Sequence, residues 1–438
     1  MKIEIYSDKT VGKIKPMHAV CGGPRSGGAM LRNDATEIFK EIGIPSSRLH
    51  DIEYPYGSEQ FVDVHCIFPC FDADENDENN YNFAATDKYI LAIKDAGCDV
   101  FYRLGESIDH FEKKLHIQPP KDYKKYARIC EHIIRHYNEG WCSGYFFNIR
   151  HWEIWNEPES KGMWSGTEVE FYEFYTAIAK HLKEGFPHLM IGGYACVGFY
   201  SETRDRAENY NAPWFDTIVP FMKGFFEYIK GKDVPIDFFS WHAYTLSPEE
   251  VVNAGRYIRN FLDEQGYENT ESYITEMNYF YSFDGKSLFQ HTEFPADVLG
   301  TMIAAQNSPI DMIFYYDVML SGYNAVFYKS PLDRKIIKAP AFNSFKFFGN
   351  LYRLENQIET VYDKNRGLYV LGASNDSKTG IAIASRDYEG NVDIYISRDK
   401  ITLLSLGEDG LISREVMTLT DGYFTLNVNK RGIYYIEA

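Results

Sequence analysis

The stretch IRHWEIWNEPES, residues 149–160, shows how this chain builds its fold. Residues 149–155 are rich in β-branched and aromatic side chains, which is typical of a buried strand, and a polar loop follows them. Pro158 disfavours helical geometry at the residue before it, so we expect an extended backbone at Glu157. The stretch therefore predicts a buried strand with a carboxylate held at its carboxyl end.

Seven other apolar runs have the same character, and amphipathic segments that end in glycine separate them. The eight expected strands cover residues 15–23, 46–51, 98–104, 149–155, 189–196, 236–244, 272–277 and 311–317. Eight strand–helix units at this spacing predict a (β/α)8 TIM barrel rather than an open doubly wound sheet. The glycines of CGGPRSGG, residues 21–28, lack the spacing of a dinucleotide-binding or phosphate-binding loop.

The last part of the chain has a different pattern of predicted secondary structure. From residue 358 onward it reads as short alternating strands broken by turn segments such as SNDSKTG and GEDG, a pattern typical of an all-β sandwich. The opening strand KIEIY, residues 2–6, lies too early to be the first barrel strand, so we expect it to join the sandwich. The alternative is a strand that closes the bottom of the barrel. The expected domains are a catalytic barrel over residues 15–344 and an accessory sandwich made of residues 1–14 and 345–438.

Composition excludes several classes of partner. The 438 residues carry a net charge of −18, which argues against binding to nucleic acid or to an anionic membrane surface. The seven cysteines include no Cys-x-x-Cys pair, so neither a disulfide framework nor a zinc ribbon is indicated. The opening MKIEIYSDKT lacks the apolar core of a signal peptide, and no apolar run reaches about 18 residues, which predicts a cytoplasmic protein. The sequence leaves the oligomeric state open, a homo-oligomer included.

Neither a metal nor an organic cofactor is expected. The acidic stretch FDADENDENN, residues 71–80, lacks the glycine and the final glutamate of an EF-hand loop, which favours a solvated loop over the barrel mouth. Cys66 and Cys70 are expected to be free thiols near the mouth, because two ligands cannot close a tetrahedral zinc site. A metal-dependent hydrolase barrel needs His-x-His on an early strand, and His65 has no such partner.

Two glutamates are the candidates for catalysis. Glu157 follows Asn156 at the end of the fourth expected strand, beside the apolar surface of Trp155. Burial beside apolar groups favours the protonated form of a carboxyl group, which a general acid requires. Glu276 ends an apolar run in SYITEMNYF, residues 272–280, on the seventh strand, which faces the fourth across a barrel mouth. Two carboxylates about 5 Å apart would make a retaining glycosidase, with one as acid/base and the other as nucleophile.

Four neighbouring side chains are candidates for holding these carboxylates or the substrate. The sixth strand ends in His242 and Tyr244, which strand alternation points into the barrel. Tyr244 is expected to donate a hydrogen bond to the nucleophile, and His242 either orients a carboxylate or a sugar hydroxyl or is a core histidine. Arg48 and His50 share one face of the second strand. Arg48 either lowers the pKa of a nearby carboxylate or belongs to a buried structural ion pair.

On these motifs the chain resembles the clan A glycoside hydrolases and, within that clan, family 39, which holds β-xylosidases and α-L-iduronidases. The motifs that carry the resemblance are Trp155–Asn156–Glu157–Pro158, Thr275–Glu276, Ser240–Trp241–His242–Ala243–Tyr244, Arg48–Leu49–His50–Asp51 and Tyr102–Arg103–Leu104–Gly105. A barrel followed by a sandwich agrees with the domain plan of the family. The resemblance implies that Glu157 is the acid/base, that Glu276 is the nucleophile and that Asn156 contacts the sugar 2-hydroxyl.

Two departures from the family pattern bear on the substrate. In the β-xylosidases an Asp-Asp pair closely follows the second-strand histidine, whereas here Asp51 stands alone and an insertion, residues 52–80, comes after it. The eighth strand carries Tyr316 and Asp317 where many clan members have a tryptophan platform. The full set of expected substrate contacts is Asn156, His50, Arg48, His242, Tyr244, Trp155, Tyr316 and Asp317.

The leading interpretation is a retaining, exo-acting, β-xylosidase-like glycoside hydrolase that cleaves oligosaccharides. One rival is a clan A endo-glycanase of another family. A rival of a different class is a carbohydrate-binding barrel that has lost catalysis. Because both glutamates, Asn156 and Tyr244 are present, the sequence gives no sign of such a loss.

Overall fold

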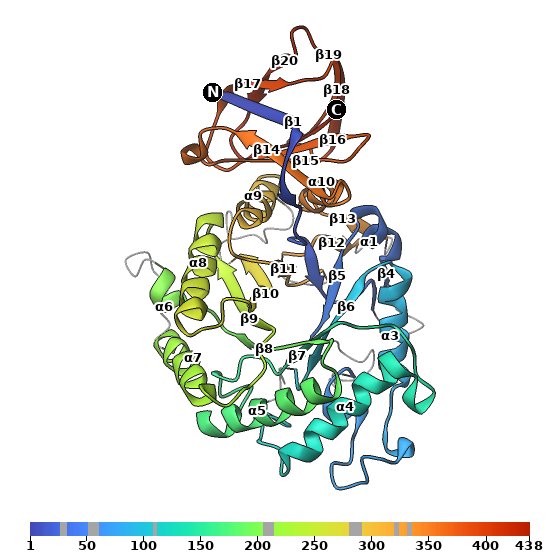
Figure 1. Cartoon of the computed structure of the whole chain (residues 1–438). Coiled ribbons are helices and arrows are strands. Elements are labelled where there is room, and N and C mark those ends of the chain that lie inside the picture. The colour runs from blue at the N-terminus through green and yellow to red at the C-terminus, as the bar shows by residue number, and fades with distance from the viewer. Residues whose placement is uncertain are drawn as a thin grey trace.

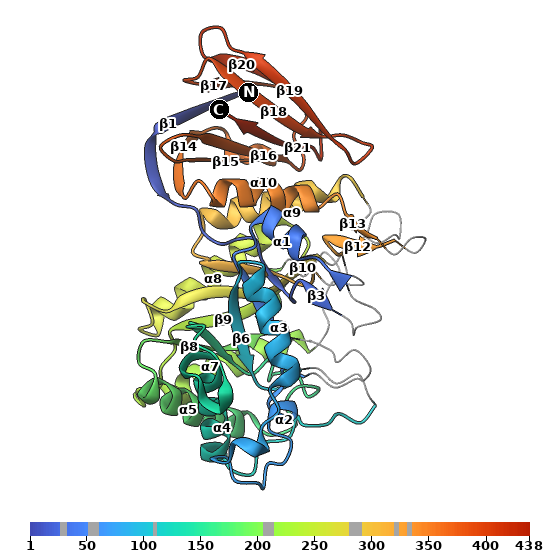
Figure 2. The ribbon, with the colours of Figure 1, turned by 90° about the vertical axis from the view of Figure 1, so that its right-hand side faces the viewer.

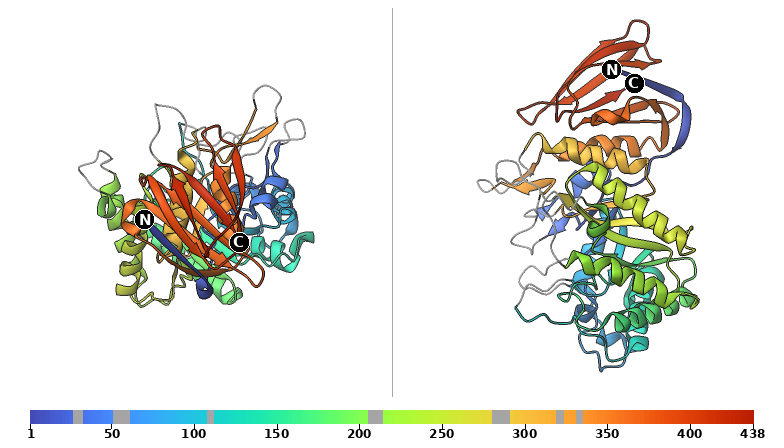
Figure 3. Two further views of the ribbon diagram at one scale, coloured as in Figure 1. Left: turned by 90° about the horizontal axis from the view of Figure 1, so that it is seen from above. Right: turned by 90° about the vertical axis from the view of Figure 1, so that its left-hand side faces the viewer.

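A computed structural model describes residues 1–26, 33–50, 61–107, 112–204, 214–279, 291–318, 324–330 and 335–438. Figure 1 shows a ring of helices around a barrel of strands, with a β-sheet body stacked on one side of the ring. Both chain termini lie in that sheet body (Figure 3). Asp51 and the first part of the expected insertion, residues 52–60, lie outside the described residues.

Eight parallel strands close the barrel in chain order, which confirms the predicted (β/α)8 architecture. They are β2 (Ala19–Cys21), β5 (Ser46–Leu49), β6 (Asp99–Leu104), β7 (His151–Ile154), β8 (Met190–Cys196), β9 (Phe238–Thr245), β10 (Glu271–Tyr279) and β11 (Met312–Tyr315). Apolar side chains from five of these strands meet inside the barrel: Ala19, Cys21, Phe101, Phe238, Tyr273 and Phe314. Polar residues further along the same strands therefore lie at the mouth of the barrel, the opening formed by the carboxyl ends of the strands. Barrel enzymes carry their active sites at this end.

The helices form the outer ring, and local sequence signals set their ends. They are α1 (Thr36–Ile42), α2 (Val64–Ile67), α3 (Ala84–Asp95), α4 (Tyr123–Glu139), α5 (Glu168–Gly185), α6 (Tyr200–Thr203), α7 (Phe215–Ile229), α8 (Pro248–Glu264), α9 (Phe294–Gln306) and α10 (Phe342–Tyr352), with 3-10 turns η1 (Glu78–Asn80), η2 (Trp141–Ser143) and η5 (Lys364–Arg366). Ser247 caps α8 by accepting a hydrogen bond from the Glu250 amide, as expected for an N-cap serine. Gly43 ends α1 in the left-handed conformation. Among the described residues, no helix has both the length and the apolar character needed to cross a bilayer.

The accessory body is one nine-stranded sheet that curls over its own apolar core. Its strands are β1 (Lys2–Lys13), β14 (Asn356–Val361), β15 (Leu368–Ser374), β16 (Thr379–Ser385), β17 (Gly390–Ile396), β18 (Lys400–Leu406), β19 (Ile412–Thr418), β20 (Tyr423–Val428) and β21 (Ile433–Glu437). β1 runs antiparallel to β14 and parallel to β17, so the first strand of the chain lies inside this sheet. Two short hairpins, β3–β4 (Arg25–Ser26, Asn33–Asp34) and β12–β13 (Phe327–Lys329, Ile336–Lys338), project on the same side of the barrel (Figure 2).

α9 and α10 lie between the barrel and the sheet (Figure 2). The expected boundary between residues 344 and 345 falls within α10, so this helix belongs to the contact between the two bodies. An ion pair also joins them: Arg431, which is half-buried and precedes β21, reaches the buried Asp297 of α9 at 2.5 Å. The two bodies therefore share a packed and charged interface.

The acidic stretch at 71–80 does not cover the mouth, which corrects the sequence-based expectation. Asp72 pairs with Lys121 at 3.0 Å, and Glu75 pairs with Arg128 at 2.7 Å. These cations stand just before and within α4, so the stretch packs on the outer helix ring. The nearby Cys66 is half-buried and Cys70 is exposed, and both are free thiols.

The buried His18 predicts a loss of stability in acid. Its Nε2 is bonded to the Gly43 carbonyl at 3.0 Å, and its ring packs against Phe348 and Tyr352. Burial lowers the pKa of His18 to about 3, whereas an unfolded histidine titrates near 6.5. Protons therefore favour the unfolded chain as the pH falls below about 6.5, at a rate of up to about 1.4 kcal/mol per pH unit.

Urea unfolding at several pH values between 7.5 and 4 will show whether His18 is responsible. In the variant His18→Gln, which keeps a hydrogen-bond donor, the free energy of unfolding should fall less steeply with acid than in the natural chain. His188→Gln, at an exposed site between α5 and β8, serves as the matched control and should keep the natural slope. Equal slopes in all three proteins would contradict the prediction.

Candidate active site

The polar mouth of the barrel is organised around Arg48, on β5. Its Nε donates to Glu153 Oε2 at 2.7 Å, its Nη1 to Glu276 Oε1 at 2.9 Å and its Nη2 to Asn156 Oδ1 at 2.8 Å. The guanidinium is fully buried, and burial alone would lower its pKa. Glu153 and Glu276 outweigh that effect and raise the pKa of Arg48 above its ordinary value. Arg48 is therefore a fixed cation beneath the mouth.

Glu276, on β10, has a hydrogen-bond donor on each carboxylate oxygen. Besides Arg48 on Oε1, Tyr244 Oη donates to Oε2 at 2.8 Å, which is the hydrogen bond expected of Tyr244 from the sequence. His50 Nε2 lies 3.6 Å from Oε1. Burial and then Arg48 lower the pKa of His50 well below its usual value, so His50 is neutral. Donors on both oxygens hold the carboxylate in one orientation, which suits a nucleophile.

The position of Glu276 depends on an irregularity in β10. Ile274 pairs with Trp241, but Glu276 already pairs with His242, so Thr275 is an extra residue in the register. Strict alternation from the inward Tyr273 would have turned Thr275 into the barrel and Glu276 out of it. The bulge reverses this and points Glu276 at the mouth, a use of bulges that is common beside active sites.

Glu157 lies opposite, against His242 of β9. Its Oε1 is 2.7 Å from His242 Nδ1, and its side chain is 23% exposed, whereas that of Glu276 is 6% exposed. Burial lowers the pKa of His242, but the carboxylates of Glu276 and Glu157 outweigh burial and raise it. One carboxylate oxygen of Glu157, one of Glu276 and a ring nitrogen of His242 all lie within 4.8 Å of one another. The mouth thus holds two facing carboxylates, one enclosed and one open to solvent.

The backbone at the end of β7 corrects the expectation of an extended Glu157. Trp155 has φ of 70° and Glu157 has φ of 45°, values that are uncommon for residues other than glycine. Two hydrogen bonds hold this turn, from the Trp155 amide to Leu104 O at 2.8 Å and from the Glu157 amide to Ala195 O at 3.1 Å. Such strained conformations persist where the surroundings fix them, and they gather at functional sites.

The same turn corrects the role expected for Trp155. Its indole is 1% exposed, its Nε1 donates to Met163 O at 3.1 Å and its ring meets Trp164 edge-on. Because the positive φ turns this side chain into the helix ring, it presents almost no surface to a sugar. Tyr316 and Asp317 are half-buried at the end of β11, and the Tyr316 ring lies 6.4 Å from that of Tyr244.

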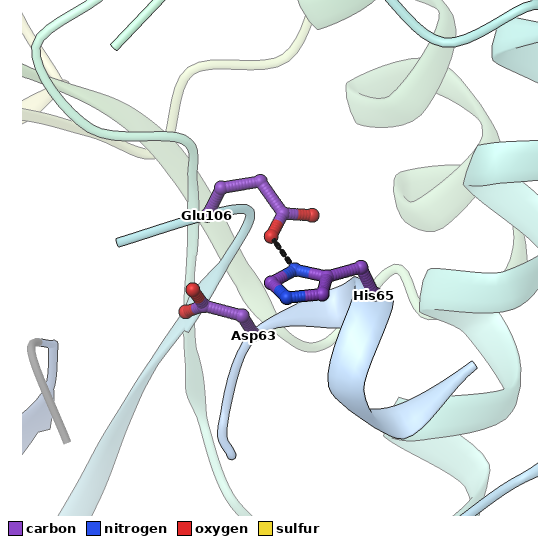
Figure 4. Close-up of side chains that lie close together, drawn as sticks. All are labelled: Asp63, His65 and Glu106. Atoms are coloured by element: carbon purple, nitrogen blue, oxygen red, sulfur yellow. Dashed lines mark hydrogen bonds and ion pairs between the residues drawn. The ribbon is translucent and has the colours of Figure 1, made fainter. Parts of the chain in front are cut away.

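Sequence reasoning missed two groups of charged side chains, one of them within the site. Glu153 is completely buried beneath Arg48, and the signal for it was a charged residue in the middle of a barrel strand, which must face the interior. The second group is a separate cluster of Asp63, His65 and Glu106 at the end of β6 (Figure 4). No local signal pointed to this cluster, because its members come from segments about 40 residues apart that only the fold brings together.

Comparisons with known proteins find a family and several relatives for this chain. A family model described as glycosyl hydrolases family 39 matches residues 1–403. The curated beta-xylosidase of Geobacillus stearothermophilus is 25% identical over 193 residues, which are 39% of this chain and 34% of that protein. The alignment therefore spans only about a third of the length of this curated relative.

Solved structures share the fold over the whole chain. A glucosidase from Croceicoccus marinus has a TM-score of 0.78 at 20% identity, covering 100% of this chain and 98% of that one. A monomeric beta-xylosidase from Caulobacter crescentus CB15 has a TM-score of 0.70 at 14% identity, covering 100% and 99%. An alpha-L-arabinofuranosidase from Thermotoga maritima has a TM-score of 0.66 at 16% identity, with the same coverage. The family match extends over both the barrel and most of the sheet, and the chain therefore belongs to glycosyl hydrolases family 39.

Proposed function

We propose that this protein is a retaining, exo-acting glycoside hydrolase that removes β-linked xylose from oligosaccharides. The observation that carries the proposal is the approach of the Glu157 and Glu276 carboxylates to within 4.8 Å. Retaining glycosidases hold their two carboxyl groups about 5–5.5 Å apart, whereas inverting enzymes leave about 6.5–9.5 Å for a water molecule.

The contacts of each carboxylate support its role. Glu276, held by Arg48 and Tyr244, attacks the anomeric carbon and forms a glycosyl-enzyme. Glu157, which is more open and contacts His242, protonates the leaving oxygen and then activates the water that releases the sugar. Asn156, whose Oδ1 accepts a hydrogen bond from Arg48, is proposed to contact the 2-hydroxyl, whose hydrogen bonds strengthen in the transition state.

Xylose is proposed from the relatives, since a beta-xylosidase stands among both the curated proteins and the solved structures that this chain resembles. A panel of 4-nitrophenyl glycosides tests the choice, with β-xyloside, α-arabinoside, β-glucoside and β-galactoside as members. We expect the highest kcat/KM on the β-xyloside and release of single xylose units from xylo-oligosaccharides. Release of longer products would favour an endo-glycanase, and no turnover of any member would favour a binding protein.

Removal of each glutamate should have a different consequence. Glu276→Gln should abolish turnover of every substrate, because no other group attacks the anomeric carbon. Glu157→Ala should lower kcat/KM by about 10²- to 10⁴-fold on poor leaving groups but far less on activated phenols, which need little protonation. Azide needs no general base, so it should restore turnover in Glu157→Ala and give a glycosyl azide of retained configuration. Equal losses on good and poor leaving groups, with no effect of azide, would contradict these roles.

Tyr244→Phe tests the hydrogen bond to the nucleophile. Loss of a hydrogen bond to a charged group should lower kcat/KM by about 10- to 100-fold. Tyr172→Phe is the matched control, because its hydroxyl donates to the Phe221 carbonyl in the helix ring, away from the mouth. The control variant should keep kcat/KM within about twofold. Similar losses in the two variants would mean that Tyr244 acts only through stability.

A further inference from the structure

The accessory sheet contacts the barrel at the first turns of α8 and α9, which are neighbours in the helix ring (Figure 1). These two helices follow β9 and β10, the strands that carry Tyr244 and Glu276. Because each helix of a (β/α)8 barrel follows the carboxyl end of a strand, the helices begin on the side of the mouth. The sheet therefore contacts the barrel close to the two strands on which the proposed reaction depends.

Arg386, the residue after β16, reaches both helices. Its Nη1 donates to Glu249 Oε2 in the first turn of α8 at 3.0 Å, and its Nη2 donates to the Leu246 carbonyl at 3.3 Å. Its Nε lies 3.3 Å from Asp297 Oδ1, in the first turn of α9. The Arg386 side chain is half-buried, and that of Asp297 is completely buried. One guanidinium therefore spans the starts of α8 and α9.

Two further residues of the sheet hold the same carboxylates. Arg431, which precedes β21, pairs with Oδ2 of Asp297 at 2.5 Å. The hydroxyl of Tyr369, on β15, donates to Glu249 Oε1. Each of the two carboxylates is thus held on both of its oxygens, which restricts its orientation as well as its distance. The starts of α8 and α9 therefore have little freedom to move relative to the sheet.

The turn between β9 and α8 connects this restraint to Tyr244. Leu246, whose carbonyl accepts from Arg386, lies two residues after Tyr244. The Leu246 amide donates to Glu250 Oε2 at 2.7 Å, and Thr245 Oγ1 donates to the same oxygen at 3.1 Å. Because Thr245 and Leu246 are both bonded to the first turn of α8, a shift of that helix would also move Tyr244.

A second connection runs from α9 to β10. Tyr279, the last residue of β10, is completely buried, and its hydroxyl donates to the Asp297 carbonyl at 2.7 Å. Tyr279 lies three residues after Glu276 on the same strand. Asp297, whose carboxylate the sheet holds, therefore also holds the end of the strand that carries the proposed nucleophile.

We propose that Arg386 is a positioning residue for the reaction, because it holds the starts of α8 and α9 so that Tyr244 and Glu276 stay within hydrogen-bond distance. The inference rests on the proposed function, since Glu276 is the carboxylate that is proposed to attack the sugar. The Tyr244–Glu276 hydrogen bond measures 2.8 Å, and its two partners come from different strands. Arg386 acts on this bond through the helices that follow those strands. The accessory sheet thereby supports the active site.

The variant Arg386→Met tests this role, since it removes the guanidinium and keeps an apolar stem. It is assayed on the 4-nitrophenyl glycoside that the natural enzyme cleaves best. We expect kcat to fall by about 10-fold, because small displacements of catalytic groups are costly, and KM to change by less than about twofold. In Tyr244→Phe the hydrogen bond is already lost. Addition of Arg386→Met to that variant should therefore lower kcat by less than about twofold more, so that the two losses are non-additive.

Arg353→Met is the matched control. Arg353 donates to the carbonyls of Lys40 and Glu41 at 2.8 and 2.9 Å, at the end of α1, and α1 does not follow β9 or β10. The control variant should keep kcat within about twofold. Thermal unfolding of every variant gives an assay temperature at which all of them are folded. If Arg386→Met does not fold, Arg386→Lys replaces it, with a smaller expected loss and the same non-additivity, because one ammonium cannot span both helices.

Two results would overturn the positioning role. One is a loss of kcat in the Arg386 variant that is no greater than the loss in Arg353→Met. The other is a loss that multiplies fully with that of Tyr244→Phe, which would mean that Arg386 acts independently of this hydrogen bond. Either result in an active enzyme refutes the positioning role alone. Inactivity of the natural enzyme on every glycoside would refute the proposed function and the positioning role together, which separates the two failures.

Discussion

The guanidinium of Arg48 donates to Glu153, Glu276 and Asn156 while it is completely enclosed by protein. A charge buried in this way is tolerated only where partners replace the lost water, and removal of one partner of such a pair typically costs about 3–5 kcal/mol. Two carboxylates share the one guanidinium, so the site carries an excess of negative charge. His242, whose pKa the carboxylates of Glu276 and Glu157 raise, lies beside that excess.

The same contacts join strands that are not neighbours in the barrel. Arg48 belongs to β5, Glu276 to β10, and Glu153 and Asn156 to β7 and the turn after it, so one side chain links three parts of the wall across the interior. The turn at Trp155–Glu157 and the bulge at Thr275 each place a glutamate where simple strand geometry would not. Below them lie the apolar side chains that fill the barrel interior, Phe101 and Phe314 among them, and these keep water out of the lower barrel. Strain and irregularity are thus confined to the rim, where the chemistry is proposed to occur.

The sequence predicted the architecture well because barrel strands and their glycine-ended helices have strong local signals. The carboxylates Glu157 and Glu276 were found for a similar reason, since each ends a recognisable apolar run. Sequence reasoning failed where backbone conformation decides direction. Trp155, beside the Asn156–Glu157 motif, was expected to contact the substrate, and only its positive φ and its burial show that its ring points into the core. The cluster of Asp63, His65 and Glu106 could not be predicted, because it depends on how the inserted segment docks on β6.

Covalent trapping tests the central claim, that Glu276 is held by Arg48 and Tyr244 as the nucleophile of a retaining reaction. The enzyme is treated with 2,4-dinitrophenyl 2-deoxy-2-fluoro-β-xyloside, whose fluorine slows release of the glycosyl-enzyme, and the protein is then analysed by intact mass and peptide mapping. The account predicts the addition of one fluoroxylosyl group per chain, attached to Glu276. Attachment to Glu157, or release of dinitrophenol with an inverted sugar and no adduct, would contradict it.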